Sequence, residues 1–248
     1  MYNLSKELRE ELEQNILPFW MNRMIDQRNG GFLGRIDGCG NPVPDAEKGA
    51  VLNARILWAF AAAYRVLHKP EYLDAATRAK DYFINHFIDV QEGGVFWSLD
   101  AQGNALDAKK QTYAIGFAIY GLSEYARATG DKEALLHAKK LYTDIERHAF
   151  DSVNNGYVEA LTRDWQPIAD MRLSDKDENG SRTMNTHLHI LEPYTNLYRV
   201  WRTPELAGRI TNLIDIFLTH LLNSETNHLD LFFNDKWQGH RNIQSFGH

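Results

Sequence analysis

The stretch "GGVFWSLDAQGNAL", residues 93–106, decides the fold because its residue pattern occurs more than once in the chain. Residues 30–43, "GGFLGRIDGCGNPV", share two glycines, a strand-like alternation, and an aspartate followed after two residues by Gly-Asn. Residues 155–168, "NGYVEALTRDWQPI", and 228–241, "HLDLFFNDKWQGHR", are more degenerate copies. This pattern is typical of a short β-hairpin. Four copies, which start 63, 62 and 73 residues apart, predict a repeat protein.

Between successive hairpins the chain has room for two helices, and the sequence indicates two. The expected helical ranges are 47–67 and 70–88, 108–130 and 131–150, and 182–202 and 203–223. Pro70 and Pro204 stand near helix starts, where proline is tolerated, and Gly130 follows a helix end. With the charged segment at the N-terminus, the sequence predicts seven helices.

The two helices of a pair differ in kind. Residues 50–64 and 113–122, in the first helices of two pairs, are apolar nearly all round, whereas residues 71–87 are amphipathic and charged. A helix that is apolar on every side is buried. The alternation therefore predicts two concentric layers of antiparallel helix pairs, with the hairpins on one face beside one end of the inner helices. A curved solenoid of helix pairs would give a similar pattern.

Bulk composition excludes several classes of partner. The 248 residues carry a net charge of −6 and include 44% hydrophobic residues, so a globular chain without a basic patch is expected and nucleic acid is not a partner. No apolar run approaches the ~20 residues of a bilayer span, and the charged N-terminus is no signal peptide. Cys39 is the single cysteine, so no intrachain disulfide forms. We expect a cytoplasmic protein that does not contact a membrane.

Metal and cofactor motifs are missing from the sequence. His187 and His189 stand two residues apart, so they do not share a helix face and make a poor zinc pair. No His-Glu-x-x-His segment, phosphate-binding loop or dinucleotide fingerprint occurs. We therefore expect neither a metal nor a cofactor.

Polar residues inside the apolar helices are the first candidates for function. Asn53 and Arg55 lie in the most apolar helix, and an arginine buried without a partner is very costly. Arg55 could form a structural ion pair with a carboxylate, or it could point into a cavity and hold an oxygen-rich ligand. Tyr113 opens the next inner helix and could belong either to the core or to a site.

The helix that follows the third hairpin, "RTMNTHLHILEPYTNLYRVWR", carries a polar stripe. At ~100° per residue, His189, Glu192 and Asn196 fall within ~40° of Asn185. His187 falls at ~200°, on the apolar side, and is predicted to be a core histidine. A polar stripe can face water or a polar cavity. The place of this helix as the first of its pair favours the cavity.

Three segments carry a resemblance to a known family: "NARILW" (53–58), "QTYAIGFAIYGLSEY" (111–125) and, above all, "MNTHLHILEPYTNLYRVW" (184–201). They resemble the cellobiose 2-epimerases of the N-acylglucosamine 2-epimerase superfamily, and the likeness covers essentially the whole chain. It implies an all-α fold, an (α/α)6 barrel of twelve helices in two rings. Because the sequence shows about seven of the twelve helices, we expect an incomplete barrel with short β-hairpins on one face.

The resemblance also implies a reaction and a site. Such enzymes epimerise C2 of the reducing-end glucose in β-1,4-linked disaccharides such as cellobiose, lactose and mannobiose-like sugars, without a cofactor. By this likeness Arg55 contacts the oxygens at C1 and C2, and Tyr113 lies beside the reacting sugar. Asn185 and His189 bind the opened sugar and help ring opening. His248, in "SFGH", matches the first histidine of the family's Gly-His-Asp-Ile-Glu motif, an acid/base residue.

The likeness stops at His248, before the Asp-Ile-Glu of that motif. The family's motif glutamate, its sugar-stacking tryptophans and its second acid/base histidine would follow. We therefore expect residues 1–248 to be a single truncated barrel domain with little or no activity, whose uncovered apolar surface promotes association. An N-acylglucosamine 2-epimerase, an aldose–ketose isomerase of the same superfamily and a non-catalytic carbohydrate-binding repeat protein remain as alternatives. The oligomeric state stays open.

Overall fold

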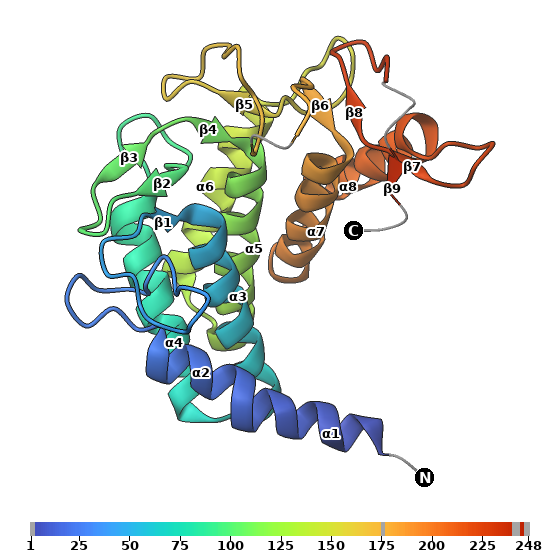
Figure 1. Ribbon diagram of the computed structural model, residues 1–248. Helices are drawn as coiled ribbons and strands as arrows, with labels where there is room; N and C mark the ends of the chain where they lie inside the picture. The colour runs from blue at the N-terminus through green and yellow to red at the C-terminus, as the bar shows by residue number, and fades with distance from the viewer. Residues whose placement is uncertain (1–2, 175–176, 240–243, 246–248) are drawn as a thin grey trace.

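The computed structural model describes residues 3–174, 177–239 and 244–245, and seven helical runs follow one another within them (Figure 1). The first run is α1 (Leu4–Glu11), a π-helical turn (Leu12–Ile16) and α2 (Leu17–Arg23). Three pairs follow: α3 (Ala50–Leu67) with α4 (Pro70–Tyr82), α5 (Thr112–Thr129) with α6 (Lys132–His148), and α7 (Met184–Val200) with α8 (Pro204–Ile216). Further π-helical turns, Phe83–Phe87 and Phe217–Leu221, prolong α4 and α8. These runs confirm the seven predicted helices, but the first residues of the predicted ranges 47–67, 108–130 and 182–202 are wrong, because they form strands.

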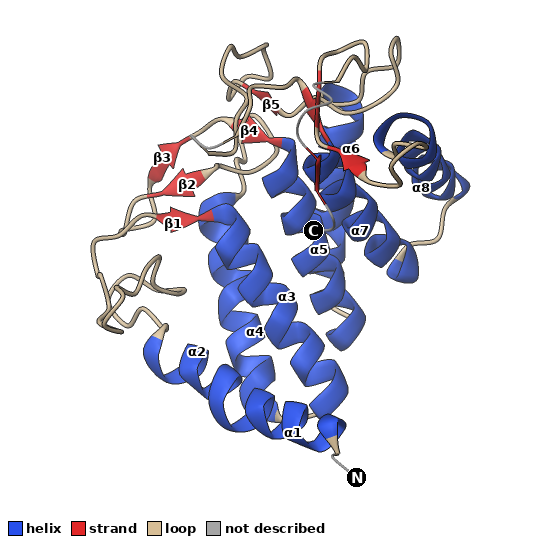
Figure 2. Ribbon diagram, turned by 45° about the vertical axis from the view of Figure 1, so that its right-hand side comes forward, coloured by secondary structure: helices blue, strands red, loops and turns tan. Residues whose placement is uncertain are grey.

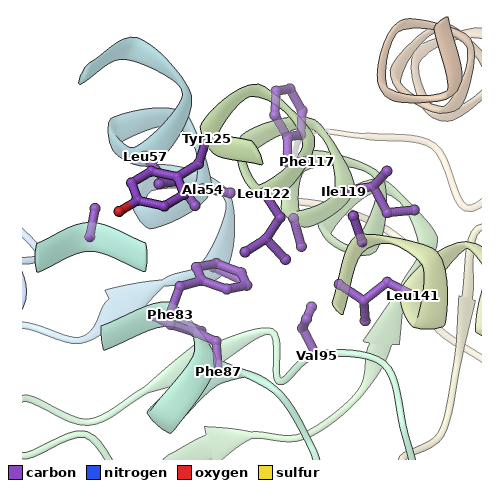
Figure 3. Close-up of a cluster of buried hydrophobic side chains, with 14 of the residues drawn as sticks. Ala54, Leu57, Phe83, Phe87, Val95, Phe117, Ile119, Leu122, Tyr125 and Leu141 are labelled. Carbon is purple, nitrogen blue, oxygen red and sulfur yellow. The ribbon is translucent and has the colours of Figure 1, made fainter. Parts of the chain in front are cut away.

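The helices form two layers (Figure 2). In the inner row α5 packs against both α3 and α7, and α4, α6 and α8 each pack on the outside of their partner. Apolar side chains fill the space between the layers, among them Leu57 of α3, Leu122 of α5 and Phe83 after α4 (Figure 3). Leu57, Leu122 and Phe83 are fully buried, as the alternation of apolar and amphipathic helices predicts.

The inner helices are not equally covered. Helix α5 has a neighbour on either side and is buried along most of its length. Helix α3 exposes Arg55, Ala59 and Val66 along one face, so the prediction that α3 is buried on every side is wrong there. Within the described residues, α3 is the helix long and apolar enough to cross a bilayer. Its contacts with α4 and α5 account for that composition.

Short strands gather at the end of the inner row where α3, α5 and α7 begin (Figure 1). They are β1 (Lys48–Gly49), β2 (Ser98–Leu99), β3 (Ala105–Asp107), β4 (Lys110–Gln111), β5 (Ala160–Leu161), β6 (Arg182–Thr183), β7 (Leu229–Asp230), β8 (Phe232–Phe233) and β9 (Gln244–Ser245). β1, β4 and β6 each lead directly into an inner helix. Each also pairs antiparallel with a strand of the next hairpin, β2, β5 and β8 respectively. The second, third and fourth hairpins therefore each tie the start of the preceding inner helix to the following repeat.

All four predicted turns form. Each is closed by an antiparallel pair: Ile36–Pro42, Leu99–Ala105, Leu161–Pro167 and Phe233–Gly239. The turn needs one residue with positive φ, which is Gly40 (+82°) and Gly103 (+93°) in the first two copies. In the last two copies Trp165 (+63°) and Trp237 (+60°) take this conformation, which is costly for a residue with a Cβ. Each indole stacks on a histidine of the preceding outer helical run, at 4.3 and 4.5 Å between ring centroids, and these contacts offset the strain.

A buried ion pair repeats beneath the hairpins. The first residue of β1, β4 and β6 is basic and at most 1% exposed. Its partner is an aspartate that follows the end of the preceding helical run. The same aspartate also accepts hydrogen bonds from backbone N–H groups of its own turn. The pairs are Lys48–Asp26 (2.8 Å), Lys110–Asp89 (2.9 Å) and Arg182–Asp151. The repeat thus fixes the end of the inner row from which the site is built.

Candidate active site

The start of α7 presents Asn185 and His189, the first members of the polar stripe that the sequence predicts. Asn196, the last member, is buried and donates hydrogen bonds to α5 instead. Thr183 caps the helix by accepting a hydrogen bond from the backbone N–H of Thr186 at 3.0 Å. Asn185 follows in the first turn and His189 in the second. Nδ1 of His189 lies 2.7 Å from a carboxylate oxygen of Glu192, so these two members of the stripe bind one another directly. The carboxylate orients the imidazole and favours the tautomer with its proton on Nδ1.

Arg55 reaches the same region from α3. Its guanidinium lies 4.4 Å from the ring centroid of Phe117, and Nη2 donates a hydrogen bond of 3.4 Å to the hydroxyl of Tyr113. The side chain is exposed, because among the described residues α5 is the one inner helix that packs against α3. Within the described residues Arg55 also forms no salt bridge, so the structural ion pair considered above is wrong for this part of the chain.

Aromatic rings join the three helices. The imidazole of His189 meets the edge of the Tyr113 ring at 4.9 Å between centroids and lies 4.8 Å from Phe117. Burial raises the pKa of Tyr113, and the neighbouring Arg55 works against that rise. The phenol therefore keeps its proton at neutral pH and can donate it in a hydrogen bond. The structure thus brings Arg55, Tyr113 and His189 together around Phe117.

The repeat explains why these residues meet. Arg55, Phe117 and His189 each lie five residues after the first residue of their helix, and Tyr113 and Asn185 each lie one residue after it. The strands that precede the three helices lie in separate small sheets, and the contacts of Arg55 and His189 with Phe117 show that the equivalent positions stand at the same level. A site built at this level takes one side chain from each repeat.

A close helix contact lies directly beneath His189. Pro193, within α7, has no N–H to donate to the carbonyl of His189 four residues earlier. On α5 a Cβ added to Gly116 would stand 2.2 Å from that carbonyl oxygen, so only glycine fits there. Gly116 and Pro193 therefore set how near α5 comes to α7 at the level of the imidazole.

His187 has the structural role that the helical wheel predicts. It is fully buried, its Nδ1 donates to the carbonyl of Thr183 at 2.7 Å, and its Nε2 accepts from the backbone N–H of Tyr157 at 3.0 Å. Burial lowers the pKa of His187 to about 4, so the imidazole is neutral at physiological pH. This prediction is confirmed.

A cavity of about 150 Å³ opens beside the start of α7. Asn185 lines it together with Glu159, Arg172, Asp177 and the hairpin residue Phe232. Within the described part of the chain, the side-chain oxygen of Asn185 is buried and accepts no hydrogen bond. The amide is therefore placed to bind a polar ligand that enters from this side.

Reasoning from the sequence missed two residues of this region and could not place a third. Phe117 looks like any core residue of an apolar helix, and only its place in the repeat, level with Arg55 and His189, distinguishes it. Glu159 stands out as the acidic residue in an otherwise strand-like segment, but its contacts lie on α7, far along the chain. His248, the predicted acid/base residue, lies outside the described residues.

Comparison with known proteins places this chain in a family. The sequence profile of the N-acylglucosamine 2-epimerase (GlcNAc 2-epimerase) family matches residues 31–245. A cellobiose 2-epimerase of Bacteroides fragilis is 59% identical over 245 residues, which are 99% of this chain and 62% of that protein. One of Ruminococcus albus is 39% identical over 242 residues, 98% of this chain and 61% of that protein. The solved cellobiose 2-epimerase of Bacillus thermoamylovorans matches with a TM-score of 0.93 at 43% identity, covering 97% of this chain and 62% of that one.

The chain folds into paired helices in two layers, like the (α/α)6 barrels of its structural neighbours. At the strand-bearing end of the inner row this scaffold carries a polar site with a guanidinium, a phenol, an imidazole and an amide. The profile match and the sequence identities then show that the chain belongs to the N-acylglucosamine 2-epimerase family. The chain spans about 62% of the length of the Bacteroides fragilis relative.

Proposed function

We propose that this chain carries one wall of the active site of a cellobiose 2-epimerase. The reaction is inversion at C2 of the reducing-end glucose in β-1,4-linked disaccharides, which converts cellobiose into glucosyl-mannose and lactose into epilactose. The meeting of Arg55, Tyr113 and His189, each from a different inner helix, carries the proposal. The 59% identity to the Bacteroides fragilis cellobiose 2-epimerase supports the choice of substrate class.

The chemistry requires no redox partner. In the open-chain sugar C2 adjoins the C1 carbonyl, so a base can remove the C2 proton. The electron pair of that C–H bond then forms the C1–C2 double bond, and the carbonyl oxygen takes the negative charge of an enediolate. Arg55 is placed to donate hydrogen bonds to the oxygens on C1 and C2, where this charge develops. Return of a proton to the opposite face of C2 gives the epimer.

The remaining residues divide between holding the sugar and moving protons. Asn185 and His189 bind the sugar while its ring opens, a step that moves a proton from the C1 hydroxyl to the ring oxygen. Because Nδ1 of His189 binds Glu192, the proton that moves during ring opening is transferred by Nε2 of His189. Tyr113, whose phenol keeps its proton, donates to a sugar oxygen. His248 is proposed as the base at C2.

We also propose that these 248 residues form an incomplete barrel and are weakly active on their own. Arg55, which should lie in an enclosed site, is exposed on the uncovered face of α3. Leu52, Ala59 and Val66 on that face line an apolar hollow against α2 and the π-helical turn before it. A site with one wall leaves the enediolate open to water, which weakens every electrostatic contact made to it.

Two proteins test both statements. One is the chain itself, and the other is a chimera in which the chain continues into the C-terminal third of the Bacteroides fragilis relative. With lactose and cellobiose, the chimera is expected to form the C2 epimers at least about 100-fold faster than the chain alone. Failure of the chimera to form either epimer would contradict the proposed reaction. Equal rates for the two proteins would contradict the proposed weak activity.

Product analysis separates the alternatives. An aldose–ketose isomerase returns the proton to C1 and so accumulates a ketose-ended disaccharide, and an N-acylglucosamine 2-epimerase prefers the acylated monosaccharide. For a non-catalytic sugar-binding protein, the substitutions Arg55→Ala and His189→Ala leave any measured turnover unchanged. The proposal predicts that both substitutions abolish most of it.

A further inference from the structure

Glu159 is a fully buried carboxylate whose side-chain hydrogen bonds all go to the first turn of α7. One carboxylate oxygen accepts from the backbone N–H of Thr183 at 3.1 Å and from its hydroxyl at 2.8 Å. The other oxygen accepts from the hydroxyl of Thr186 at 2.8 Å. Thr183 and Thr186 flank Asn185 on either side, so this carboxylate holds the turn that presents the amide.

The backbone of Glu159 binds the start of α5. Its carbonyl accepts from the N–H of Thr112 at 3.0 Å, and Thr112 directly precedes Tyr113. Its own N–H donates to the carbonyl of Ser181 at 3.0 Å, in the approach to β6. One residue thus joins the first turns of two neighbouring inner helices, each of which supplies a side chain to the site.

We propose that Glu159 is a positioning residue that sets Asn185 and His189 of α7 against Tyr113 of α5. This inference rests on the function proposed above, because it assigns Glu159 a role in that same site. We assign Glu159 to holding the turn and not to binding the sugar, because both of its carboxylate oxygens accept hydrogen bonds from Thr183 or Thr186. It acts through the placement of the amide and the imidazole.

Charge makes Glu159 more than a spacer. A negative charge at the start of α7 is favoured by the helix dipole and by three donors. Burial raises the pKa of Glu159 to about 7, while the hydrogen bonds from Thr183 and Thr186 limit the rise. Arg172, Asp177 and Glu178 line the same cavity, and Asp177 and Tyr113 of α5 are near enough to interact with the charge of Glu159. The carboxylate of Glu159, which holds the start of α7, therefore changes its charge near neutral pH.

Nuclear magnetic resonance of the 248-residue chain tests the inference without requiring turnover. The backbone amide signals of Thr183 and Thr186 are followed from about pH 5.5 to about 8.5. We expect both to shift together with a midpoint near 7, and we expect the substitution Glu159→Gln to remove this transition. A matched control is Glu146→Gln, because Glu146 is also a buried carboxylate but binds the hydroxyls of Tyr157 and Tyr194 and the guanidinium of Arg209 instead. A transition that is absent in the unchanged chain, persists in Glu159→Gln or disappears in Glu146→Gln overturns the inference.

A second variant guards against misfolding of the first. Thr186→Val removes one donor that favours the charged carboxylate and should shift the midpoint to higher pH. A midpoint that stays or falls contradicts the inference.

Turnover supplies a separate reading in the chimera described above. Glu159→Gln should lower kcat about tenfold, and Glu146→Gln should change it less than about twofold. Equal effects of the two substitutions contradict the inference. If the unchanged chimera does not turn over, the proposed function fails and the amide titration alone decides the role of Glu159.

Discussion

Two sets of side chains near the start of the inner helices obey opposite rules. Below the hairpins the repeat uses the same chemistry each time: Lys48, Lys110 and Arg182 are buried and paired with an aspartate. Five residues into the helices the repeat changes its chemistry each time, from Arg55 to Phe117 to His189. Repeated chemistry marks what every helix pair needs in order to fold. Chemistry that differs between equivalent positions marks the site.

Burial explains why the cations of the two sets differ, although Phe117 and His189 of the second set are themselves buried. A cation inside the protein must be paired and hydrogen-bonded, so each repeat supplies both members of its ion pair. Arg55 is exposed and lies over an aromatic ring, and within the described residues it has no carboxylate partner, so its donors remain available to a ligand. We therefore expect substitutions in the repeated ion pairs to lower stability and substitutions in the site to lower activity.

The largest expected effect is on stability, at Lys110. Replacement by methionine leaves Asp89 buried beside Arg163 alone and should lower the free energy of unfolding by about 3–5 kcal/mol. Denaturant unfolding measures the change. Lys109→Met is the control, because Lys109 is partly exposed and pairs with Asp107 at 3.3 Å, and its loss should cost under about 1 kcal/mol. Similar losses in both variants would show that the repeated pair is not structural.

A pH-dependent loss of stability is expected from His187. Its pKa falls from an ordinary value of about 6.5 when unfolded to about 4 when folded, so only the unfolded chain takes up a proton between these values. The free energy of unfolding should therefore lose about 3 kcal/mol as the pH falls from about 6.5 to about 4. Glu159, with its raised pKa, contributes the opposite slope from about pH 4.5 to about 7.

Subtracting a His187→Gln variant from the unchanged chain isolates the histidine, since Glu159 is common to both. Glutamine can still donate to the carbonyl of Thr183 and accept from Tyr157. The difference in unfolding free energy should shrink as the pH falls. A constant difference would contradict the burial argument.

Arg55→Ala should separate activity from stability. Loss of a donor to the enediolate costs about 3 kcal/mol of barrier, or roughly a 100-fold fall in kcat/KM, whereas the unfolding free energy should change by no more than about 0.5 kcal/mol. Kinetics in the chimera and unfolding of the chain measure the two effects. Arg65→Ala, farther along α3, should lower the unfolding free energy and leave kcat/KM nearly unchanged, because Arg65 binds the buried carboxylate of Glu124 at 2.6 Å. Equal kinetic losses would remove Arg55 from the site.

A pair of glycines gives the smallest effects, with opposite signs. Gly116→Ala places a Cβ against the carbonyl of His189 and should lower the unfolding free energy by about 1–3 kcal/mol. Gly208→Ala, in α8, meets nothing within 4 Å and should raise it by about 0.5–1 kcal/mol. Thermal unfolding of the two variants gives both signs. A stabilising Gly116→Ala would show that α5 and α7 can move apart at the site.

Local patterns accounted for much of this structure. Helix ranges, the hairpin turns, the core place of His187 and the stripe through Asn185 and His189 follow from periodicity and turn chemistry, which depend on near neighbours. The exposure of Arg55 does not follow from them, because it depends on which inner helix lacks a neighbour. The role of Glu159 could not be predicted either, since its partners lie 24 and 27 residues away in the sequence. Long-range contacts of this kind leave no periodic signal.

The central claim is that the wall formed by Arg55, Tyr113, Asn185 and His189 serves proton exchange at C2 of a disaccharide. The most direct measurement is incubation of the chimera with cellobiose in D₂O, with the hydrogen on C2 of the reducing-end sugar followed by nuclear magnetic resonance. The account predicts that glucosyl-mannose forms with deuterium at C2, and that Arg55→Ala slows this exchange about 100-fold. Epimer without deuterium at C2, deuterium at C1 of a ketose, or exchange unaffected by Arg55→Ala would contradict it.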